Sequence, residues 1–252
     1  MLRRLALVLP LLLLAACAEE PAPVPPAEPS AGAAPEDAVT TAPAASDAGS
    51  CAAAAPAEGD TLTVLFFGDS LTAGYGLADP EAQAYPALIE EKAREAGLPV
   101  RAVNAGVSGE TSAGGLRRIE WVLGGTRPDV FVLALGANDG LRGLDPAAMQ
   151  ANLEGILACV RDAAPEARLV VAGMEALPNY GPDYGVRFRA VFPAVAERFD
   201  AVLVPFLLED VGGVRRLNQA DGVHPTAEGQ RVMAETVWDA LAPVLREAAA
   251  AS

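Results

Sequence analysis

Five short runs of apolar, largely β-branched residues recur through the chain, and each gives way to small or polar residues. The runs cover residues 61–67, 98–103, 129–135, 167–172 and 201–204. Because polar residues do not alternate regularly with the apolar ones, each strand is expected to be buried on both faces, as in a parallel sheet. Stretches with helical spacing lie between and after the runs, near residues 84–96, 111–123, 146–163, 183–198 and 226–245. This alternation predicts a single α/β domain with helices on both faces of a five-stranded parallel sheet.

The chain begins with a segment that is typical of export. Arg3 and Arg4 precede 12 apolar residues, 5–16, a run too short to cross a bilayer but of the size found in secretory signals. The run ends in Leu-Ala-Ala-Cys at residues 14–17, which resembles the lipobox of bacterial lipoproteins. That resemblance implies that residues 1–16 are a signal peptide and that Cys17 is lipidated. The alternative is an ordinary signal peptide followed by a cysteine without a role.

Residues 17–60 are interpreted as the lipidated cysteine and a tether. The stretch after Cys17 is rich in Ala and Pro, contains acidic residues but no Lys or Arg, and has Val24 and Val39 as its only large aliphatic residues. Such a composition buries too little apolar area to offset the entropy of ordering, so we expect a disordered tether. The folded domain is then assigned to residues 61–248. The protein is expected to be an exported bacterial lipoprotein, anchored to a membrane and facing the periplasm or the cell exterior.

Charge and residue counts exclude several classes of partner. The formal net charge of −15 disfavours nucleic acid, since binding phosphates requires a basic face. The chain has one histidine and three scattered cysteines, which excludes a metal site built from those residues. Two interpretations stay open for the cysteines that remain after lipidation. Cys159 is either buried as a small apolar residue or joined to Cys51 by a disulfide that pins the tether to the domain.

Candidate catalytic residues follow the predicted strands, and the carboxyl ends of parallel strands meet in one crevice. Ser70 follows the first strand and supplies a hydroxyl nucleophile. His224 is the only imidazole of the chain, and Asp221 lies three residues ahead of it, so the two are expected to act as base and orienting carboxylate. Candidate donors to the oxyanion are the backbone N–H groups of Ser70 and Gly106 and the side-chain amide of Asn138. These components predict acyl transfer through a Ser-His-Asp triad.

The sequence around these residues resembles the GDSL, or SGNH, hydrolase family. Ser70, Gly106, Asn138 and His224 fall on the four positions that give the family its name, in the right order. The resemblance extends over roughly residues 63–245, and it is similar in detail to the branch that contains thioesterase I/lysophospholipase and bacterial arylesterases. It implies a flavodoxin-like three-layer α/β/α fold, no cofactor, and hydrolysis of a small-molecule carboxylic ester, or of a thioester or lysophospholipid, through an acyl-enzyme.

The resemblance also implies a substrate site formed by Gly140, Leu141, Leu177 and Pro178. One departure lies in residues 175–178, Glu-Ala-Leu-Pro, where relatives usually have two adjacent prolines. This departure puts the shape of the acyl pocket in question, and leaves the chemistry intact. The catalytic domain is expected to act as a monomer.

Several alternatives remain at this level. Within the same fold the enzyme is alternatively a carbohydrate O-deacetylase, and in a different class the chain is a catalytically silent surface lipoprotein that binds a partner. Ser70 is alternatively only a helix N-cap. Trp121 is expected in the core because of its helical spacing, and Arg118 is expected to be solvated.

Overall fold

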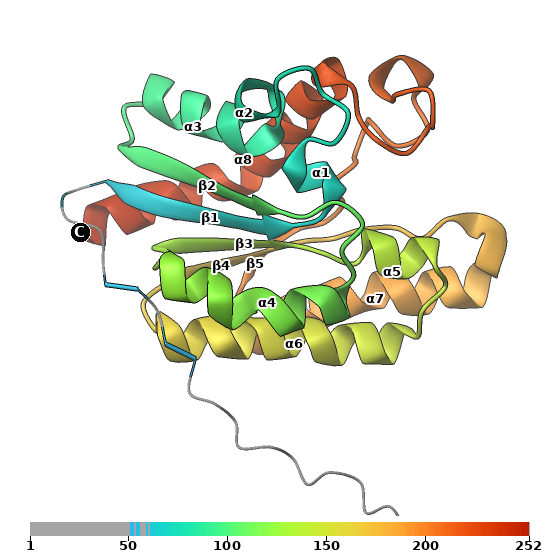
Figure 1. The fold of residues 1–252 in the computed structure, drawn as a ribbon, viewed down its shortest axis with the longest axis horizontal. Helices are drawn as coiled ribbons and strands as arrows, with labels where there is room; N and C mark the ends of the chain where they lie inside the picture. The colour runs from blue at the N-terminus through green and yellow to red at the C-terminus, as the bar shows by residue number, and fades with distance from the viewer. Residues whose placement is uncertain (1–50, 53, 56–58, 60, 252) are drawn as a thin grey trace, which may run out of the picture. The chain divides into compact units, whose positions relative to one another are not determined.

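A computed structural model describes residues 51, 52, 54, 55, 59 and 61–251. Its centre is a five-stranded sheet in which all neighbouring strands are parallel and the order is β2-β1-β3-β4-β5 (Figure 1). This is the flavodoxin-like order of a doubly wound sheet, and it confirms the predicted fold class. The strands are β1 (Leu62–Gly68), β2 (Val100–Gly106), β3 (Val130–Ala134), β4 (Arg168–Ala172) and β5 (Val202–Val204).

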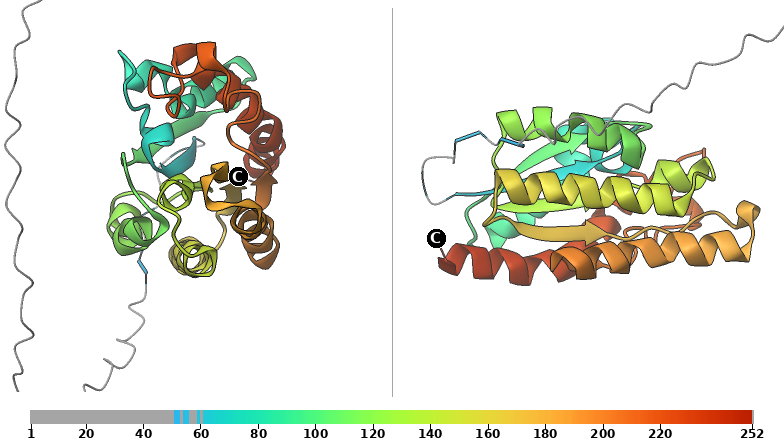
Figure 2. Two further views of the ribbon diagram at one scale, coloured as in Figure 1. Left: turned by 90° about the vertical axis from the view of Figure 1, so that its right-hand side faces the viewer. Right: turned by 90° about the horizontal axis from the view of Figure 1, so that it is seen from below.

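Two layers of helices cover the sheet (Figures 1 and 2). The layer on one face contains α1 (Ser70–Ala73), α2 (Pro80–Gln83), α3 (Tyr85–Glu95) and α8 (Ala227–Ala251). The layer on the other face contains α4 (Ser112–Gly125), α5 (Ala137–Leu141), α6 (Pro146–Ala163) and α7 (Pro182–Phe199). Two short 3-10 turns, η1 (Pro178–Tyr180) and η2 (Arg215–Leu217), lie in the connections. Helix α6 has the bounds expected from its apolar face and from Asp145 and Pro146 at its start.

The strand order places a topological switch point between β1 and β3. The chain leaves β1 toward one helical layer and leaves β3 toward the other, so the two strand ends open a crevice at the carboxyl edge of the sheet. Figure 2, left, looks onto this edge. Every residue of β1 and of β3 is buried, which accounts for their continuous apolar runs. The crevice therefore rests on the two most buried strands.

The expected bounds of the second strand are wrong. The sequence predicts that it ends at residue 103, but β2 continues to Gly106, which pairs in register with Gly68 at the end of β1. Strand β2 is also an edge strand, and its residues are exposed or only partly buried. The prediction that every strand is buried on both faces therefore fails for β2, and also for β5 at the opposite edge, where only Val204 is buried.

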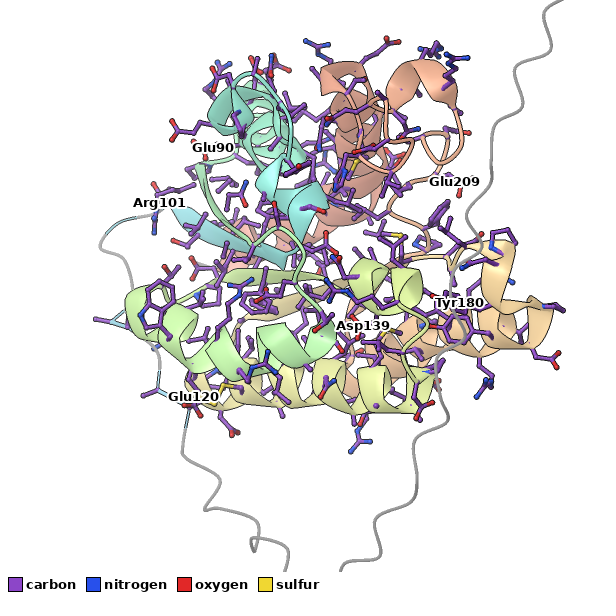
Figure 3. The ribbon with its side chains drawn as sticks, turned by 45° about the vertical axis from the view of Figure 1, so that its right-hand side comes forward. Glu90, Arg101, Glu120, Asp139, Tyr180 and Glu209 are labelled. Atoms are coloured by element: carbon purple, nitrogen blue, oxygen red, sulfur yellow. A yellow bond between two sulfur atoms is a disulfide. The ribbon has the colours of Figure 1, made fainter. Side chains whose placement is uncertain are left out.

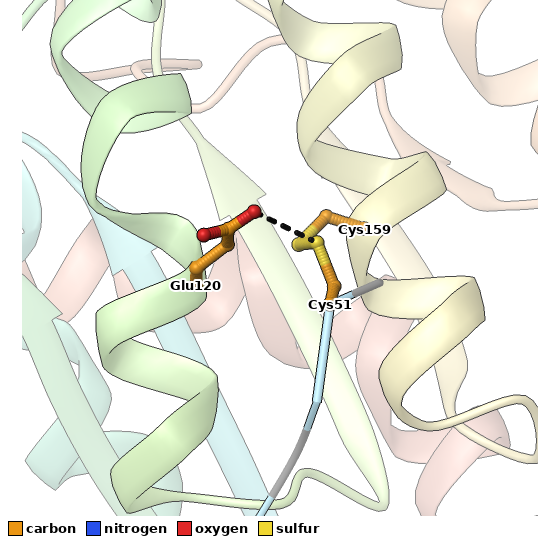
Figure 4. The surroundings of a disulfide bond; sticks show 3 residues. All are labelled: Cys51, Glu120 and Cys159. Atoms are coloured by element: carbon orange, nitrogen blue, oxygen red, sulfur yellow. Dashed lines mark hydrogen bonds between the residues drawn. A yellow bond between two sulfur atoms is a disulfide. The ribbon is translucent and has the colours of Figure 1, made fainter. Parts of the chain in front are cut away.

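A disulfide joins Cys51 to Cys159 on α6 (Figure 4). Cys159 is buried, as expected of a small apolar residue, but it is not a free thiol, so the disulfide interpretation is the one that the structure supports. Glu120 of α4 places its Oε1 3.7 Å from Cys51 Sγ, and the Ala54 N–H donates to Leu123 O near the end of α4. The segment ahead of β1 is thus attached to the layer that contains α4 and α6.

Two further expectations about α4 are wrong. Trp121 is 82 % exposed, because its side of the helix lies beside the edge strand and faces solvent. Arg118 is mostly buried: it pairs with Glu110, and its guanidinium lies 3.9 Å from the centroid of the Phe67 ring. Its Nη2 also donates to Ala105 O at 2.8 Å and to Gly68 O at 3.3 Å. Arg118 therefore ties the carboxyl ends of β1 and β2 together.

None of the described helices is long and apolar enough to cross a membrane. The predicted signal peptide, Cys17 and most of the predicted tether lie outside the described residues.

Candidate active site

Three side chains lie in series at the carboxyl edge of the sheet. Ser70 is the first residue of α1, directly after the turn that ends β1, and its Oγ lies 3.0 Å from His224 Nε2. His224 Nδ1 lies 2.8 Å from Asp221 Oδ2. An ionised carboxylate only accepts hydrogen bonds, so Nδ1 is the ring nitrogen that bears the proton and Nε2 is left to accept from the Ser70 hydroxyl. The geometry is that of a nucleophile, a base and an orienting group.

Asp221 is held as an anion by local hydrogen bonds. The His224 ring is the largest influence, and the backbone N–H groups of His224 and Val223 both donate to Asp221 Oδ1 at 3.0 Å. Together they lower the pKa of Asp221 to about 2. The carboxylate therefore stays charged through the pH range in which an imidazole serves as a base.

The loop that contains His224 is attached to the loop after α1 by Gln219. Its Nε2 donates to Tyr75 O at 2.7 Å and to Pro225 O at 3.0 Å, while its backbone N–H donates to His224 O at 2.7 Å. Gly76 fits against the Gln219 amide, where a larger residue would collide. The Tyr75 ring lies 4.6 Å from the imidazole, centroid to centroid. These contacts set the position of His224 relative to the first strand end.

Helix α1 is fixed by buried and partly buried polar contacts from neighbouring elements. Thr72 Oγ1 and Tyr85 OH are 2.9 Å apart, and Gln230 Nε2 of α8 donates to Leu71 O at 3.2 Å. From the edge strand, Asn104 Nδ2 donates to Thr72 O at 2.8 Å. Gly68 completes the fit, since an added Cβ there would collide with the Thr72 side chain. The nucleophile is thus positioned by contacts from β2, α3 and α8.

Asn138 enters the crevice from the opposite side of the switch point. It is the second residue of α5, follows β3, and lines the same cavity as Ser70. Its neighbour Asp139 is buried and accepts from the Ser112 N–H at 2.8 Å and from Ser112 Oγ at 2.6 Å, which fastens α5 to the start of α4. Asn152 of α6 donates to the same Ser112 Oγ at 3.0 Å. Figure 3 shows Asp139 between the ribbons of α4 and α5.

The structure does not place Gly106 at the site. Its N–H lies on the outer edge of β2 and donates to Asn104 Oδ1 at 3.0 Å, so it is not free to bind an oxyanion. Beyond the strand, Gly109 has φ +80° in the turn that leads to α4. Its carbonyl accepts from Arg142 Nη2 at 3.0 Å, and Arg142 caps the helix that contains Asn138. The turn after β2, rather than its last residue, therefore approaches α5.

A largely apolar cavity of about 300 Å³ opens beside Ser70 and Asn138. Three of the residues expected at the substrate site, Leu141, Leu177 and Pro178, line it, and its other walls include Met174, Phe206, Leu208 and Val223. The fourth, Gly140, does not line the cavity. It packs against the Phe188 ring of α7, where an added Cβ would come within 2.9 Å, so its role is helix packing.

The rim of the cavity is shaped by the connection from β4 to α7. Glu175 Oε1 accepts from Arg189 Nη1 at 3.0 Å. Tyr180 OH donates to Leu141 O at 3.1 Å, and Figure 3 shows Tyr180 beside the start of α7. Leu177 is about half exposed at this rim. Apolar residues thus continue from the cavity to its mouth.

Several residues that build the site escape prediction from the sequence. Gln219, Gln230, Asn104 and Arg118 act through hydrogen bonds to backbone carbonyls of distant segments. The only signal available was their position inside or near the sequence blocks that contain the catalytic candidates. Across the described residues, no group of three or more His, Cys, Asp or Glu side chains is arranged to hold a metal ion.

A serine aligned with a histidine–aspartate pair, beside an apolar cavity at the switch point of a doubly wound sheet, defines the class of serine hydrolases. Comparison with known proteins narrows that class. Residues 66–232 match the GDSL-like lipase/acylhydrolase family. The chain therefore belongs to this family and is a carboxylic ester hydrolase.

Individual relatives agree with this assignment. Esterase TesA of Pseudomonas aeruginosa is 43 % identical over 73 % of this chain and 89 % of its own length. Thioesterase 1/protease 1/lysophospholipase L1 of Escherichia coli (strain K12) is 37 % identical over 75 % of this chain and 86 % of its own. The crystal structure of AlinE4, an SGNH-hydrolase family esterase, is 42 % identical over 76 % of this chain and 98 % of its own, with a TM-score of 0.61.

Proposed function

We propose that Ser70, His224 and Asp221 are the catalytic triad and that the reaction passes through an acyl-enzyme. The observation that carries the proposal is the unbroken series of contacts from Ser70 Oγ through the imidazole to the Asp221 carboxylate, at 3.0 and 2.8 Å. His224 is the only histidine of the chain, and its unprotonated ring nitrogen contacts the serine hydroxyl.

The reaction begins when Ser70 Oγ attacks the carbonyl carbon of the ester while its proton passes to His224 Nε2. The tetrahedral intermediate then breaks its bond to the leaving group, which takes the proton from Nε2 and departs as an alcohol, or as a thiol from a thioester. A water molecule attacks the resulting acyl-serine, with Nε2 again accepting the proton. Collapse releases the carboxylic acid and returns the proton to Ser70.

The negative oxygen of the intermediate requires fixed donors. We assign the Ser70 N–H, which has no intrahelical acceptor at the first position of α1, and the Asn138 side-chain amide. Gly109 replaces Gly106 as the source of the third N–H group, since its turn is tied to the end of α5 through Arg142. Removing one such donor typically lowers kcat by about 100- to 1000-fold in other hydrolases.

The cavity supports an acyl ester with an extended apolar chain as the substrate. Its volume of about 300 Å³ and its walls of aliphatic and aromatic residues are more than an acetyl group would fill. An ester, a thioester or a lysophospholipid would present such a chain, as the names of the relatives suggest for those proteins. A carbohydrate O-deacetylase would not require these apolar walls.

We further propose that the protein is an exported lipoprotein attached to a membrane through Cys17. The support is the sequence of residues 3–17, in which a basic start and an apolar run lead to the cysteine. Fractionation of cells that express the full chain checks this location, and recovery of the protein in the soluble cytoplasmic fraction would contradict it.

A fluorophosphonate probe and a panel of p-nitrophenyl esters of graded chain length test the triad. The wild type should be labelled at Ser70 and should prefer acyl chains longer than acetyl. Ser70→Ala and His224→Ala should each lose about a thousandfold or more in kcat, with little change in stability. Turnover near the wild-type rate in either variant, or exclusive cleavage of acetyl esters, would contradict the proposal.

A further inference from the structure

A buried carboxylate lies directly ahead of the nucleophile and has no part in the reaction just described. Asp69 is 1 % exposed, and its Oδ1 accepts from the Leu71 N–H at 3.0 Å, which caps α1. In the part of the chain that the structure describes, no Lys or Arg forms an ion pair with it. Capping alone requires one oxygen of the carboxylate, so the second oxygen is available for another role.

The second oxygen faces the proposed oxyanion donor. Asn138 Nδ2 donates to Asp69 Oδ2, with the two atoms 3.4 Å apart in buried surroundings. A side-chain amide has two ends of opposite character: Oδ1 accepts and the NH₂ group donates. Because an ionised carboxylate can only accept, it requires the NH₂ end of Asn138 to face it. One hydrogen of that NH₂ group is then used by Asp69, and the other is left for a ligand in the cavity.

The rest of Asn138 is already fixed by its backbone. Gly136 begins the turn with φ +118°, and the Asp139 carboxylate is held by Ser112 on the side of α4. These contacts place the Asn138 Cα but do not decide which end of the amide points toward Ser70. That choice depends on rotation about the last side-chain bond, on which Asp69 acts directly.

The raised pKa of Asp69 sets the pH range in which it can hold this role, because only the ionised carboxylate is restricted to accepting hydrogen bonds. Burial is the main influence and raises the pKa of Asp69 to about 7, while the hydrogen bonds from Leu71 and Asn138 lower it. The other charged groups that act on it are Asp139 of α5, which raises the pKa, and His224, which lowers it. A carboxylate with so little solvation depends on its few N–H donors. Turning the Asn138 amide around would replace one of these donors with an acceptor oxygen, which is unfavourable in free energy.

We propose that Asp69 is a positioning residue that holds the Asn138 side chain with its NH₂ group presented to the oxyanion. The inference rests on the proposed function, in which Asn138 is a donor to the intermediate. Asp69 does not contact the substrate. It acts by excluding the rotamer in which Asn138 Oδ1, an acceptor, would face the developing negative charge.

The isosteric variant Asp69→Asn separates this role from capping. Its Oδ1 still accepts from Leu71, but an NH₂ group replaces Oδ2 and opposes the NH₂ group of Asn138, so the Asn138 amide should turn. At a pH well above the raised pKa of Asp69, kcat for a p-nitrophenyl ester should fall about 10- to 100-fold with KM within about twofold. In an Asn138→Ala background the same substitution should cost less than about threefold, because the group that it misplaces is already absent.

Controls distinguish failure of this inference from failure of the proposed function. Asp145→Asn is the matched control: Asp145 caps α6 through Ala147 N at 3.3 Å, away from the cavity, and should leave kcat unchanged. A wild type without fluorophosphonate labelling or ester hydrolysis would overturn the proposed function. An active wild type together with a fully active Asp69→Asn variant, or with losses that multiply in the double variant, would overturn the role of Asp69 alone.

A measurement on the wild type covers the case in which Asp69→Asn does not fold. The two side-chain amide protons of Asn138, observed by ¹⁵N–¹H correlation, should have widely separated shifts, because one of them is bonded to a carboxylate. Slow exchange of that proton with solvent is also expected. Two closely similar shifts with fast exchange would overturn the proposal.

Discussion

The nucleophile and the base of this site are held in different ways. The contacts that fix α1, from Tyr85 to Thr72 and from Gln230 to Leu71, are buried, and the second joins residues 159 positions apart. The hydrogen bonds that shape the loop containing His224 are exposed: those to Asp221 are local, and the one from Gln219 attaches the loop to Tyr75 O. The fold itself thus positions the serine, whereas a turn and one glutamine position the histidine. Substitutions on the first side should cost stability together with activity, and those on the second should cost activity alone.

The largest expected effect concerns Asp69, on the nucleophile side, and it appears in the pH dependence of stability. Its pKa is raised to about 7 in the folded protein, so between about pH 4 and pH 7 the folded state binds more protons than the unfolded state. The free energy of unfolding should therefore fall as the pH rises through this interval, by an amount on the order of 4 kcal/mol for this group. Asp69→Asn should remove that part of the slope. Urea denaturation of both proteins at a series of pH values measures it, and parallel curves would contradict it.

A smaller loss of stability is expected for Gln230→Ala. The substitution leaves the Tyr85 N–H, which donates to Gln230 Oε1 at 2.9 Å, and the Leu71 carbonyl without partners in the core. The cost should be about 2 kcal/mol, which lowers Tm by roughly 4–8 °C in a domain of this size, and kcat should fall as well. Gln83→Ala is the control, since Gln83 also accepts from a backbone N–H, that of Asp79, but at the surface. Equal Tm values for Gln230→Ala and Gln83→Ala would contradict the prediction that the buried contact contributes more to stability than the exposed one.

The smallest effect is expected on the base side, for Gln219→Ala. Without this amide the loop that contains His224 loses its attachment to Tyr75 O, so kcat should fall about fivefold while Tm changes by less than about 1 °C. Gln150→Ala, which removes a partly buried hydrogen bond to Glu154 within α6, should change neither quantity. A drop in Tm as large as that of Gln230→Ala would show that both sides of the site are equally tied to the fold.

The sequence predicts the strands and helices of the fold because buried segments have recognisable patterns of apolar residues. Strands β1 and β3 are covered on both faces, so they appear as continuous apolar runs with small or polar residues at their ends. Since parallel strands share one carboxyl edge, the positions of Ser70, Asn138 and His224 in the chain were enough to expect them in one crevice.

What the sequence does not predict depends on neighbours in space. Strand β2 lies at the edge, so no apolar run marks its end at Gly106, and the sequence does not reveal that the N–H of this residue is used by Asn104 Oδ1. Trp121 has helical spacing, but the edge position of α4 beside β2 leaves it in solvent. The disulfide between Cys51 and Cys159 requires proximity of two residues 108 positions apart, which spacing alone cannot establish.

The disulfide determines where a mechanical load on the N-terminal side would enter the domain. A pull applied ahead of Cys51 passes through the sulfur bridge into α6, an 18-residue helix packed between α4 and α7, before it reaches Leu62 at the start of β1. The strand that leads to Ser70 is thereby shielded from tension. With both thiols reduced, the same pull would act on β1 at the centre of the sheet. The disulfide therefore keeps a force applied ahead of Cys51 from distorting the crevice.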